Sequence, residues 1–528
     1  MIGVLQDTRN GGHPTKGAFQ MKSVRQILRN EKRRVEARLS RAVRHPRRRP
    51  MLTASRGRYE LDERTRAIAH GGIGAIHQMV HHLGLPASIN ARLKLLKVHN
   101  PYFESDHVLN IAYNALCGGQ TLDDIELRRN DQAARDALGA ESTPDPTTAG
   151  DFCRRFTDRA VDDLQAAIND VRVEVWRQQP AEFFDEIARI DADGTMVETC
   201  GECKEGMDIS RKGQWGYHPL LVSLANTGEP LFIKNRSGNR PSHEGVVPYF
   251  DMAIAMCRRA GFETIMLRGD TDFSLTKHFD RWDDDGVLFV FGYDAKQNLT
   301  AHADGIGEDE YSELVRRAER VIATKPRKRP TKYKQLKVEE RGFTTLKLIG
   351  EDVVEFMYSP TACNREYLMV AVRKTIAVEK GQQHLFDEIR YFFYITNATE
   401  YLLTDEIVAE ARQRCNQENL IAQLKGGVRA LHAPVNTLVA NEAYMVMTAL
   451  AWTLKAWMGL LLPISPRWRQ RHLAQRRRII TMEFRSFINA FIALPTQIVT
   501  TGRQLIYRVL AWRPTLEVFF RFAHAFKT

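Results

Sequence analysis

The chain has 528 residues, 43% of them hydrophobic, which is the composition of a folded protein and excludes an intrinsically disordered one. This length is too great for one hydrophobic core and indicates roughly two to four domains. The formal net charge of +12 favours a polyanionic partner, with nucleic acid first and an anionic membrane surface second.

Cysteine usage and hydropathy both bear on the compartment. The seven cysteines, an odd number scattered along a long chain, indicate a reducing environment without a disulfide framework. The N-terminus lacks the apolar core of a signal peptide. The longest apolar run, from Met447 to Leu462, contains Lys455, is too short to span a bilayer and favours a buried helix. These features predict a cytoplasmic protein with no membrane partner.

Residues 1–58 are predicted to form a basic N-terminal arm. Lys and Arg far outnumber the three acidic residues in this segment. Such a run is typical of a solvated, poorly ordered arm, and equally of an arm that binds phosphates. The two descriptions are compatible, and we expect backbone contacts to DNA from the densest part, which ends in Arg47, Arg48 and Arg49.

Residues 59–180 are predicted to form a helical DNA-binding domain. Apolar residues recur at spacings of three and four in 107–116 and again in 161–176. A glycine pair at 118–119 separates two helices, and the segment 144–148 leads into a helix cap. Short helices joined by tight turns are consistent with helix-turn-helix DNA reading, although a plain helical domain gives the same pattern.

The segment Ile187–Thr195 alternates apolar and polar residues and is predicted to be a strand that ends in carboxylates. In an extended strand Asp191 and Asp193 lie on the same face, about 6.6 Å apart. A carboxylate at the end of a buried strand is costly unless it is paired or holds a metal. An aspartate that caps the following turn would explain this stretch equally well.

The rest of 181–299 is predicted to be the first part of an α/β core. Apolar runs at 219–224 and 230–234 flank a hairpin turn, which gives three consecutive antiparallel strands with the Asp193 strand. A helix at 246–259 leads to a buried strand at 263–267, which is followed by Asp270, and a parallel neighbour follows at 287–291. This order of strands and helices is that of a ribonuclease H-like mixed sheet.

Residues 300–385 interrupt the core with a predicted β-rich insertion. A basic tract there precedes short strand-like runs at 344–348, 353–358 and 367–372. The core resumes over 386–460 with a buried strand at 391–396. Residues 461–528 are predicted to be a basic, helical C-terminal region.

A long helix over 404–425 is predicted from its cap at Thr404 and its stop at two glycines. Arg414, Glu418 and Lys425 recur at offsets of four and seven, so they share one helix face. Taken alone, an exposed ion pair and a solvated lysine would explain this face.

Three carboxylates connect these elements. Asp193 and Asp270 each follow an apolar strand of one predicted sheet, and Glu418 lies on the helix after the last strand. Hard oxygen ligands without nearby His or Cys suit Mg²⁺ or Mn²⁺ rather than zinc. A pair of such ions could activate a water or a 3′-hydroxyl for attack on a phosphodiester.

At these positions the chain resembles the DDE transposases of bacterial insertion sequences, in the IS-four-like group and the family numbered thirteen-eighty. The first motif of that group, Asp-x-Thr, matches Asp193-Gly194-Thr195, and its second matches Arg268-Gly269-Asp270 with Phe273. Its third, Tyr-x2-Arg-x3-Glu-x6-Lys, matches Arg414, Glu418 and Lys425, but Ala411 stands in place of the tyrosine.

The resemblance covers about residues 105–460 and implies both an activity and its participants. The activity is metal-dependent cleavage and strand transfer, with Asp193, Asp270 and Glu418 as catalytic ligands of two Mg²⁺ or Mn²⁺ ions. The partners are double-stranded DNA, as terminal inverted repeats and as target, and a second copy of the chain in the synaptic complex at the bacterial nucleoid. We also predict DNA contacts from Arg268, Arg414 and Lys425, together with the three arginines of the N-terminal arm.

Some alternatives stay open on the sequence. Asp191 could replace Asp193 as the ligand, although the Asp-x-Thr match favours Asp193. No tryptophan lies between Trp282 and Trp452 to stack a flipped base as in relatives of the group, so a hairpin intermediate is undecided. A metal-dependent nuclease without strand transfer, or a DNA-binding relative without catalysis, are the alternative functions.

Overall fold

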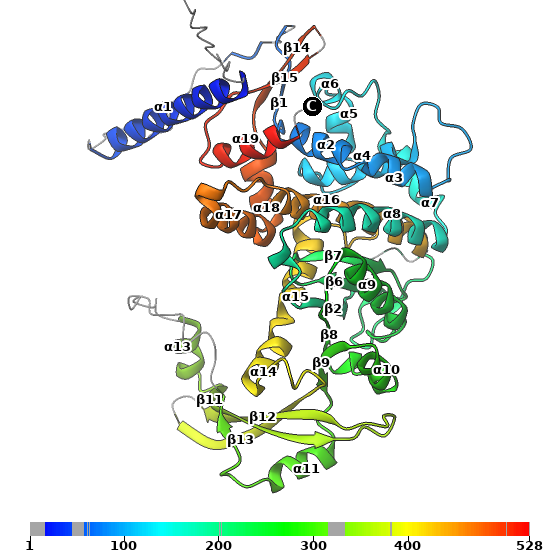
Figure 1. Ribbon diagram of the computed structural model, residues 1–528, viewed down its shortest axis with the longest axis vertical. Helices are drawn as coiled ribbons and strands as arrows, with labels where there is room; N and C mark the ends of the chain where they lie inside the picture. The colour runs from blue at the N-terminus through cyan, green and yellow to red at the C-terminus, as the bar shows by residue number, and fades with distance from the viewer. Residues whose placement is uncertain are drawn as a thin grey trace, which may run out of the picture.

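The structure is a computed structural model, which describes residues 16–44, 58–60, 62, 64–199, 201, 203–314, 333–380, 383–502 and 504–526. It is mixed α/β, with one large mixed sheet and a layer of helices packed against one end of it (Figure 1). No helix among the described residues is long and apolar enough to cross a membrane.

The large sheet has nine strands in the order β10-β11-β12-β13-β9-β8-β2-β6-β7. The strands that come first in the sequence confirm the predicted order of three antiparallel strands followed by parallel neighbours. The antiparallel strands are β2 (Ala188–Gly194), β6 (Leu220–Leu224) and β7 (Glu229–Lys234). Parallel to β2 run β8 (Ile265–Gly269) and then β9 (Val287–Tyr293). Every residue of β8 and β9 is buried, as expected for parallel strands covered on both faces.

Alternation along β8 and β9 sorts their side chains onto two faces. Leu267 and Phe289 join the main core, to which the crossover helix α9 (Val246–Ala260) contributes. Met266 and Val290 face the other way and pack with Ile407 and Val408 of α14 (Thr404–Gln413). Helix α14 is therefore held against the face of the sheet opposite α9.

The strands of the predicted insertion extend the same sheet. They are β10 (Ser312–Glu313), β11 (Thr344–Tyr358) and β12 (Tyr367–Lys380). β13 (Gln383–Thr396), which lies mostly in the resumed core, pairs with β12, and all these pairings are antiparallel. Strand β11 joins the two short runs expected at 344–348 and 353–358, with a shift in register between Leu348 and Gly350. The run expected at 391–396 is the end of the longer β13, which pairs with β9.

The helical region after residue 59 is described as α2 (Ile73–His82), α3 (Leu85–Arg92), α4 (Glu104–Leu116), α5 (Ile125–Arg129), α6 (Gln132–Leu138), α7 (Pro146–Arg154) and α8 (Asp158–Arg177). Four of these helices, α2, α4, α7 and α8, pack against α16 (Leu438–Leu460), whose residues from Ala440 onward are all buried. The buried helix predicted from the long apolar run is therefore confirmed, and the Nζ of Lys455 within it donates to the Ile480 carbonyl at 2.8 Å.

The two ends of the chain differ from the sequence prediction. A long helix, α1 (Lys16–Arg44), stands where a poorly ordered arm was expected, and it lies beside α19 (Leu516–Ala525) (Figure 1). The C-terminal region contains α17 (Arg469–Thr481) but also a hairpin of β14 (Thr496–Thr501) and β15 (Gln504–Val509). β14 pairs with β1 (Ala67–Ile68), so the C-terminal hairpin is joined to the helical region.

Candidate active site

Two carboxylates lie at the same edge of the large sheet. Asp193 is the last residue but one of β2, and Asp270 follows directly after the end of β8. Strands β2 and β8 are parallel neighbours, with Asp191 aligned to Arg268. Because parallel strands end at the same edge, the two aspartates are brought to one place although 77 residues separate them in the chain.

Asp193 faces the junction between two helices. Its Oδ2 lies 3.5 Å from Nη1 of Arg414, and the two side chains are 15% and 16% exposed. Burial raises the pKa of Asp193 to about 6; the Arg414 charge opposes this rise, and the charges of Asp270 and Glu418 add to it. Asp270 and Glu418 therefore both lie close enough to Asp193 for their charges to act on it.

Asp270 begins a short 3-10 turn, and its Oδ1 accepts a hydrogen bond from the Asp272 amide at 3.0 Å. Burial raises the pKa of Asp270, against the lowering effect of Arg414, and Asp272 contributes to the rise. Arg414 is thus the cation that acts on both strand-end aspartates. Two neighbouring carboxylates with raised pKa values and one partly exposed arginine form a site short of positive charge.

Asp191 lies on the same strand but is engaged elsewhere. Its two oxygens accept hydrogen bonds from Nε and Nη2 of Arg268, at 2.7 and 2.9 Å, and both side chains are only 1% exposed. Arg268 also donates to Glu410 at 2.7 Å, and Glu410 accepts two further bonds of 2.8 Å from Arg189. This buried network ties β2, β8 and α14 together and favours Asp193 as the available carboxylate.

The same network corrects the prediction for Arg268. The sequence suggested that its side chain contacts DNA, but its guanidinium is enclosed by Asp191 and Glu410 inside the protein. The error arose because Glu410, its second partner, is 142 residues away in the chain. Arg268 therefore holds β2, β8 and α14 together inside the protein, and the prediction that it contacts DNA is wrong.

The predicted helix over 404–425 is interrupted at Arg414. Helix α14 ends there, α15 (Cys415–Ala422) begins directly after it, and a π-helical turn follows at Gln423–Gly427. The buried Gln417 fixes α15 to the sheet, since its Nε2 donates to the backbone oxygens of Asp191 and Leu221 at 3.3 and 3.1 Å. The next residue, the exposed Glu418, lies close enough to Asp193 for its charge to raise the pKa of that carboxyl.

Lys425 also faces this edge. It is half-buried, and burial lowers its pKa, against the raising effects of Glu198 and Asp193. The structure therefore brings Arg414, Glu418 and Lys425 near Asp193 despite the break in the helix. Gln417 and Glu410 were missed in the sequence, since neither belongs to the motifs and only their tertiary contacts reveal them.

Close packing around Gly194 explains why a residue without a side chain follows Asp193. A Cβ atom at this position would lie 2.6 Å from the His218 ring and 3.1 Å from the Ser242 backbone. His218 is in turn influenced by burial, which lowers its pKa, and by the charges of Arg236, Lys425 and Asp272. The histidine ring thus packs directly against Gly194, the residue that follows Asp193.

The donors at this edge of the sheet are oxygens of carboxylates. Within the described residues, no three His, Cys, Asp or Glu side chains are gathered closely enough to hold an ion. The side chains nearest the edge are nevertheless carboxylates, whose hard oxygens suit Mg²⁺ or Mn²⁺. Their raised pKa values indicate that added positive charge would be favourable there.

A basic cleft lies far from this edge, between α1 and the C-terminal helices. It has a volume of about 910 Å³ and is lined by six Arg or Lys side chains against Glu36 and Glu517. The cations are Arg25, Arg29, Lys32, Arg471, Arg513 and Arg521, and Trp468 and Trp512 also line the cleft. The predicted contacts Arg47, Arg48 and Arg49 lie outside the described residues.

Comparisons with known proteins give one family match. The family described as transposase DDE domain group 1 matches residues 65–522. No curated protein matches the chain. Among solved structures, a piggyBac transposase synaptic complex with hairpin DNA is similar at 10% identity and a TM-score of 0.31, over 80% of this chain and 82% of that chain. The family match includes the elements from β1 to β15 and most of α19.

Proposed function

The chain belongs to the transposase DDE domain group 1 family, and we propose that it mobilises a bacterial insertion sequence. It binds the terminal inverted repeats, cuts the DNA there and joins the 3′ ends to target DNA. We assign it to the IS-four-like group and to the family numbered thirteen-eighty. We also assign a ribonuclease H-like core to the sheet; the support is the order of β7, β6, β2, β8 and β9 with the crossover helix α9.

One observation carries this proposal: Asp193 and Asp270 lie at adjacent ends of parallel strands, the Arg414 charge acts on both, and the Glu418 charge acts on Asp193. Asp193, Asp270 and Glu418 are the proposed catalytic residues. They come from β2, β8 and α15, three elements whose relative positions are fixed by the buried ion pairs of Asp191 and Arg268 and by Gln417.

These three carboxylates would hold Mg²⁺ or Mn²⁺. When bound, a pair of such ions supplies an activated oxygen nucleophile and stabilises the leaving oxygen of a phosphodiester. The protein contributes the carboxylates and their fixed support. Arg414 balances part of their charge, because its guanidinium forms an ion pair with Asp193.

Arg414 and Lys425 are proposed to position the scissile strand. A guanidinium can bind two phosphate oxygens at once, and an ammonium supplies a compact charge. Both side chains are incompletely buried and both act on Asp193, so a strand that approaches the carboxylates passes them. Neither is needed as a metal ligand.

The rest of the DNA is proposed to lie on basic surfaces. The cleft between α1, α17 and α19 carries six cations against two carboxylates, which suits a phosphodiester backbone. The arginines at 47–49, which follow α1 in the sequence, are proposed to add further phosphate contacts. Two copies of the chain would bring the two ends of the element together in the synaptic complex.

A product assay tests strand transfer against simple hydrolysis. The purified protein is given Mn²⁺, a labelled repeat end that carries a free 3′-hydroxyl, and an unlabelled supercoiled target. Joined molecules that contain label and target are expected, whereas a repeat end of scrambled sequence should give none. If only shortened labelled strands form, the protein is a nuclease without strand transfer.

A further inference from the structure

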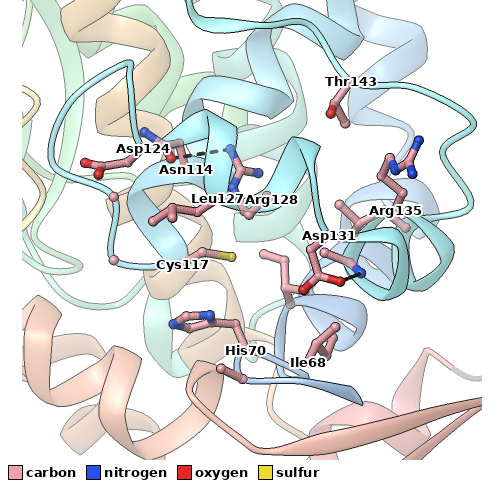
Figure 2. A pocket seen from close by; sticks show the side chains of 16 residues that line it. Ile68, His70, Asn114, Cys117, Asp124, Leu127, Arg128, Asp131, Arg135 and Thr143 are labelled. Atoms are coloured by element: carbon pink, nitrogen blue, oxygen red, sulfur yellow. Dashed lines mark hydrogen bonds between the residues drawn. The ribbon is translucent and has the colours of Figure 1, made fainter. Parts of the chain in front are cut away.

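A second cavity lies in the helical region, remote from the carboxylates. It has a volume of about 280 Å³ and is enclosed by β1, the end of α4, α5 and α6 (Figure 2). Part of its wall is aliphatic, with Ile68, Ile73, Leu127, Ala134 and Leu138. The remainder is polar and includes Arg128, Arg135 and Thr143, so the cavity suits a ligand with an apolar and a polar part.

Arg128 enters this cavity without a negatively charged partner. Its Nη2 donates to the Asn110 carbonyl at 3.1 Å and to the side-chain oxygens of Asn110 and Asn114 at 3.2 and 3.4 Å, all of them neutral. Its Nε is buried and has no hydrogen-bond partner. Among the described residues no carboxylate forms an ion pair with it, and burial lowers its pKa. A half-buried guanidinium whose Nε is cut off from water and unpaired is costly unless a ligand neutralises it.

Two aspartates line the cavity but are already engaged with the backbone. Asp124 accepts hydrogen bonds from the amides of Gln120 and Thr121, at 2.7 and 2.9 Å. Asp131 caps α6 by accepting from the Ala134 amide at 3.2 Å. Figure 2 shows these carboxylates turned to the backbone on either side of Arg128. They leave the guanidinium unneutralised.

Further polar groups on the wall also lack partners. The Nε of Arg135 and the Oγ1 of Thr143 are buried and make no hydrogen bond. Burial lowers the pKa of His70 on the opposite wall, and the Arg128 charge lowers it further. The polar side of the cavity therefore offers unmatched donors beside an arginine that no described carboxylate pairs with, which suits an anion rich in acceptor oxygens.

We propose that this cavity binds a nucleotide, with its phosphate at Arg128 and its base against the aliphatic wall. A simple inorganic anion would leave that wall unfilled. Leu127 lines the opening and is 75% exposed, and an exposed leucine beside a cavity can replace a base that leaves the DNA stack. The nucleotide can thus be part of bound DNA or a free mononucleotide. Only the first source rests on the proposed function.

Binding of free 2′-deoxymononucleotides is measured first, by calorimetry and by thermal unfolding of the full chain carrying Asp193→Asn. This background separates nucleotide binding from cleavage. The melting temperature should rise with ligand concentration, as it does for any ligand of the folded state. Arg128→Met should weaken binding about tenfold or more, and Arg128→Lys should restore part of it. Arg129→Met is the matched control, because the adjacent Arg129 is exposed and pairs with Glu126 at 3.2 Å.

Extrusion of a base from bound DNA is measured with repeat-end duplexes that carry 2-aminopurine at one position at a time. An extruded base gives increased fluorescence at one position, which Arg128→Met and Leu127→Ala should abolish and Arg129→Met should retain. A positive result in either assay assigns the source of the nucleotide. The proposal is overturned if neither ligand responds, if Arg129→Met loses binding as Arg128→Met does, or if inorganic phosphate stabilises the protein as strongly as mononucleotides.

Discussion

The Arg414 guanidinium lies 3.5 Å from the Asp193 carboxylate, at the point where α14 gives way to α15. This contact joins the helix that carries Glu418 to the strand that carries the first catalytic aspartate. It also places a protein cation beside carboxylates proposed to hold divalent metal. The arginine is therefore expected to act on DNA and to compete with the metal.

Replacement of Arg414 tests this role. Arg414→Ala should retain or strengthen Mn²⁺ binding, because a competing charge is removed, yet it should lower the cleavage rate of a pre-nicked repeat end by about tenfold or more. Calorimetric Mn²⁺ titration and single-turnover cleavage measure the two effects. Arg412→Ala is the control, since Arg412 pairs with Glu351 at 2.8 Å instead. Near-normal cleavage by Arg414→Ala would reduce this arginine to a structural contact.

Replacement of the two strand aspartates should separate support from catalysis. Asp191→Asn removes one partner of a buried bidentate ion pair and should lower the free energy of unfolding by on the order of 3 kcal/mol. Asp193→Asn loses a longer, partly exposed contact and should change it by about 1 kcal/mol or less. Urea denaturation measures both. A stable Asp191→Asn protein that no longer binds Mn²⁺ would show that Asp191 is the ligand.

Glu442 should make stability depend on pH. It is fully buried on α16 and accepts from the Lys234 ammonium and the Asn235 amide, both at 3.1 Å. Burial raises its pKa to about 7 from the ordinary 4.5. Between these values the folded state binds more protons than the unfolded state, so stability is lost as pH rises through this window.

Glu442→Gln removes the titrating group and should flatten this dependence. The difference in unfolding free energy between the two proteins should change by on the order of 2 kcal/mol from pH 4.5 to 7.5, in favour of the variant at high pH. Urea denaturation across the range supplies the measurement. A constant difference would mean that Glu442 stays ionised beside Lys234.

The basic cleft should appear in the salt dependence of DNA binding. Each phosphate contact adds about 0.9 to the slope of log affinity against log salt. Arg25→Glu with Arg29→Glu should reduce that slope by at least this amount and weaken binding to repeat and random duplexes alike. Arg159→Glu is the control, because the Arg159 side chain on α8 is 93% exposed. Loss of repeat preference with an unchanged slope would instead make the cleft a reader of sequence.

The sequence predicted the parts of the fold that local pattern controls. Alternation and turn residues placed β2, β6, β7, β8 and β9, and motif spacing led to Asp193, Asp270 and Glu418. The buried partners of Arg268 could not be predicted, because Glu410 meets it only through the packing of α14 on the sheet. The length of β13 was hidden by its exposed charged residues, and the C-terminal hairpin around 502 was overlooked in a region dominated by arginine.

The most direct test of the account is cleavage of repeat-end DNA by Asp193→Asn, Asp270→Asn and Glu418→Gln in Mn²⁺. Each variant should lose cleavage while its gel shift with the same DNA is retained, since the fold and the basic surfaces are unchanged. Asp272→Asn, in the loop beside Asp270, is the control and should cleave. Full cleavage by Glu418→Gln would contradict the assignment of the three carboxylates as the catalytic centre.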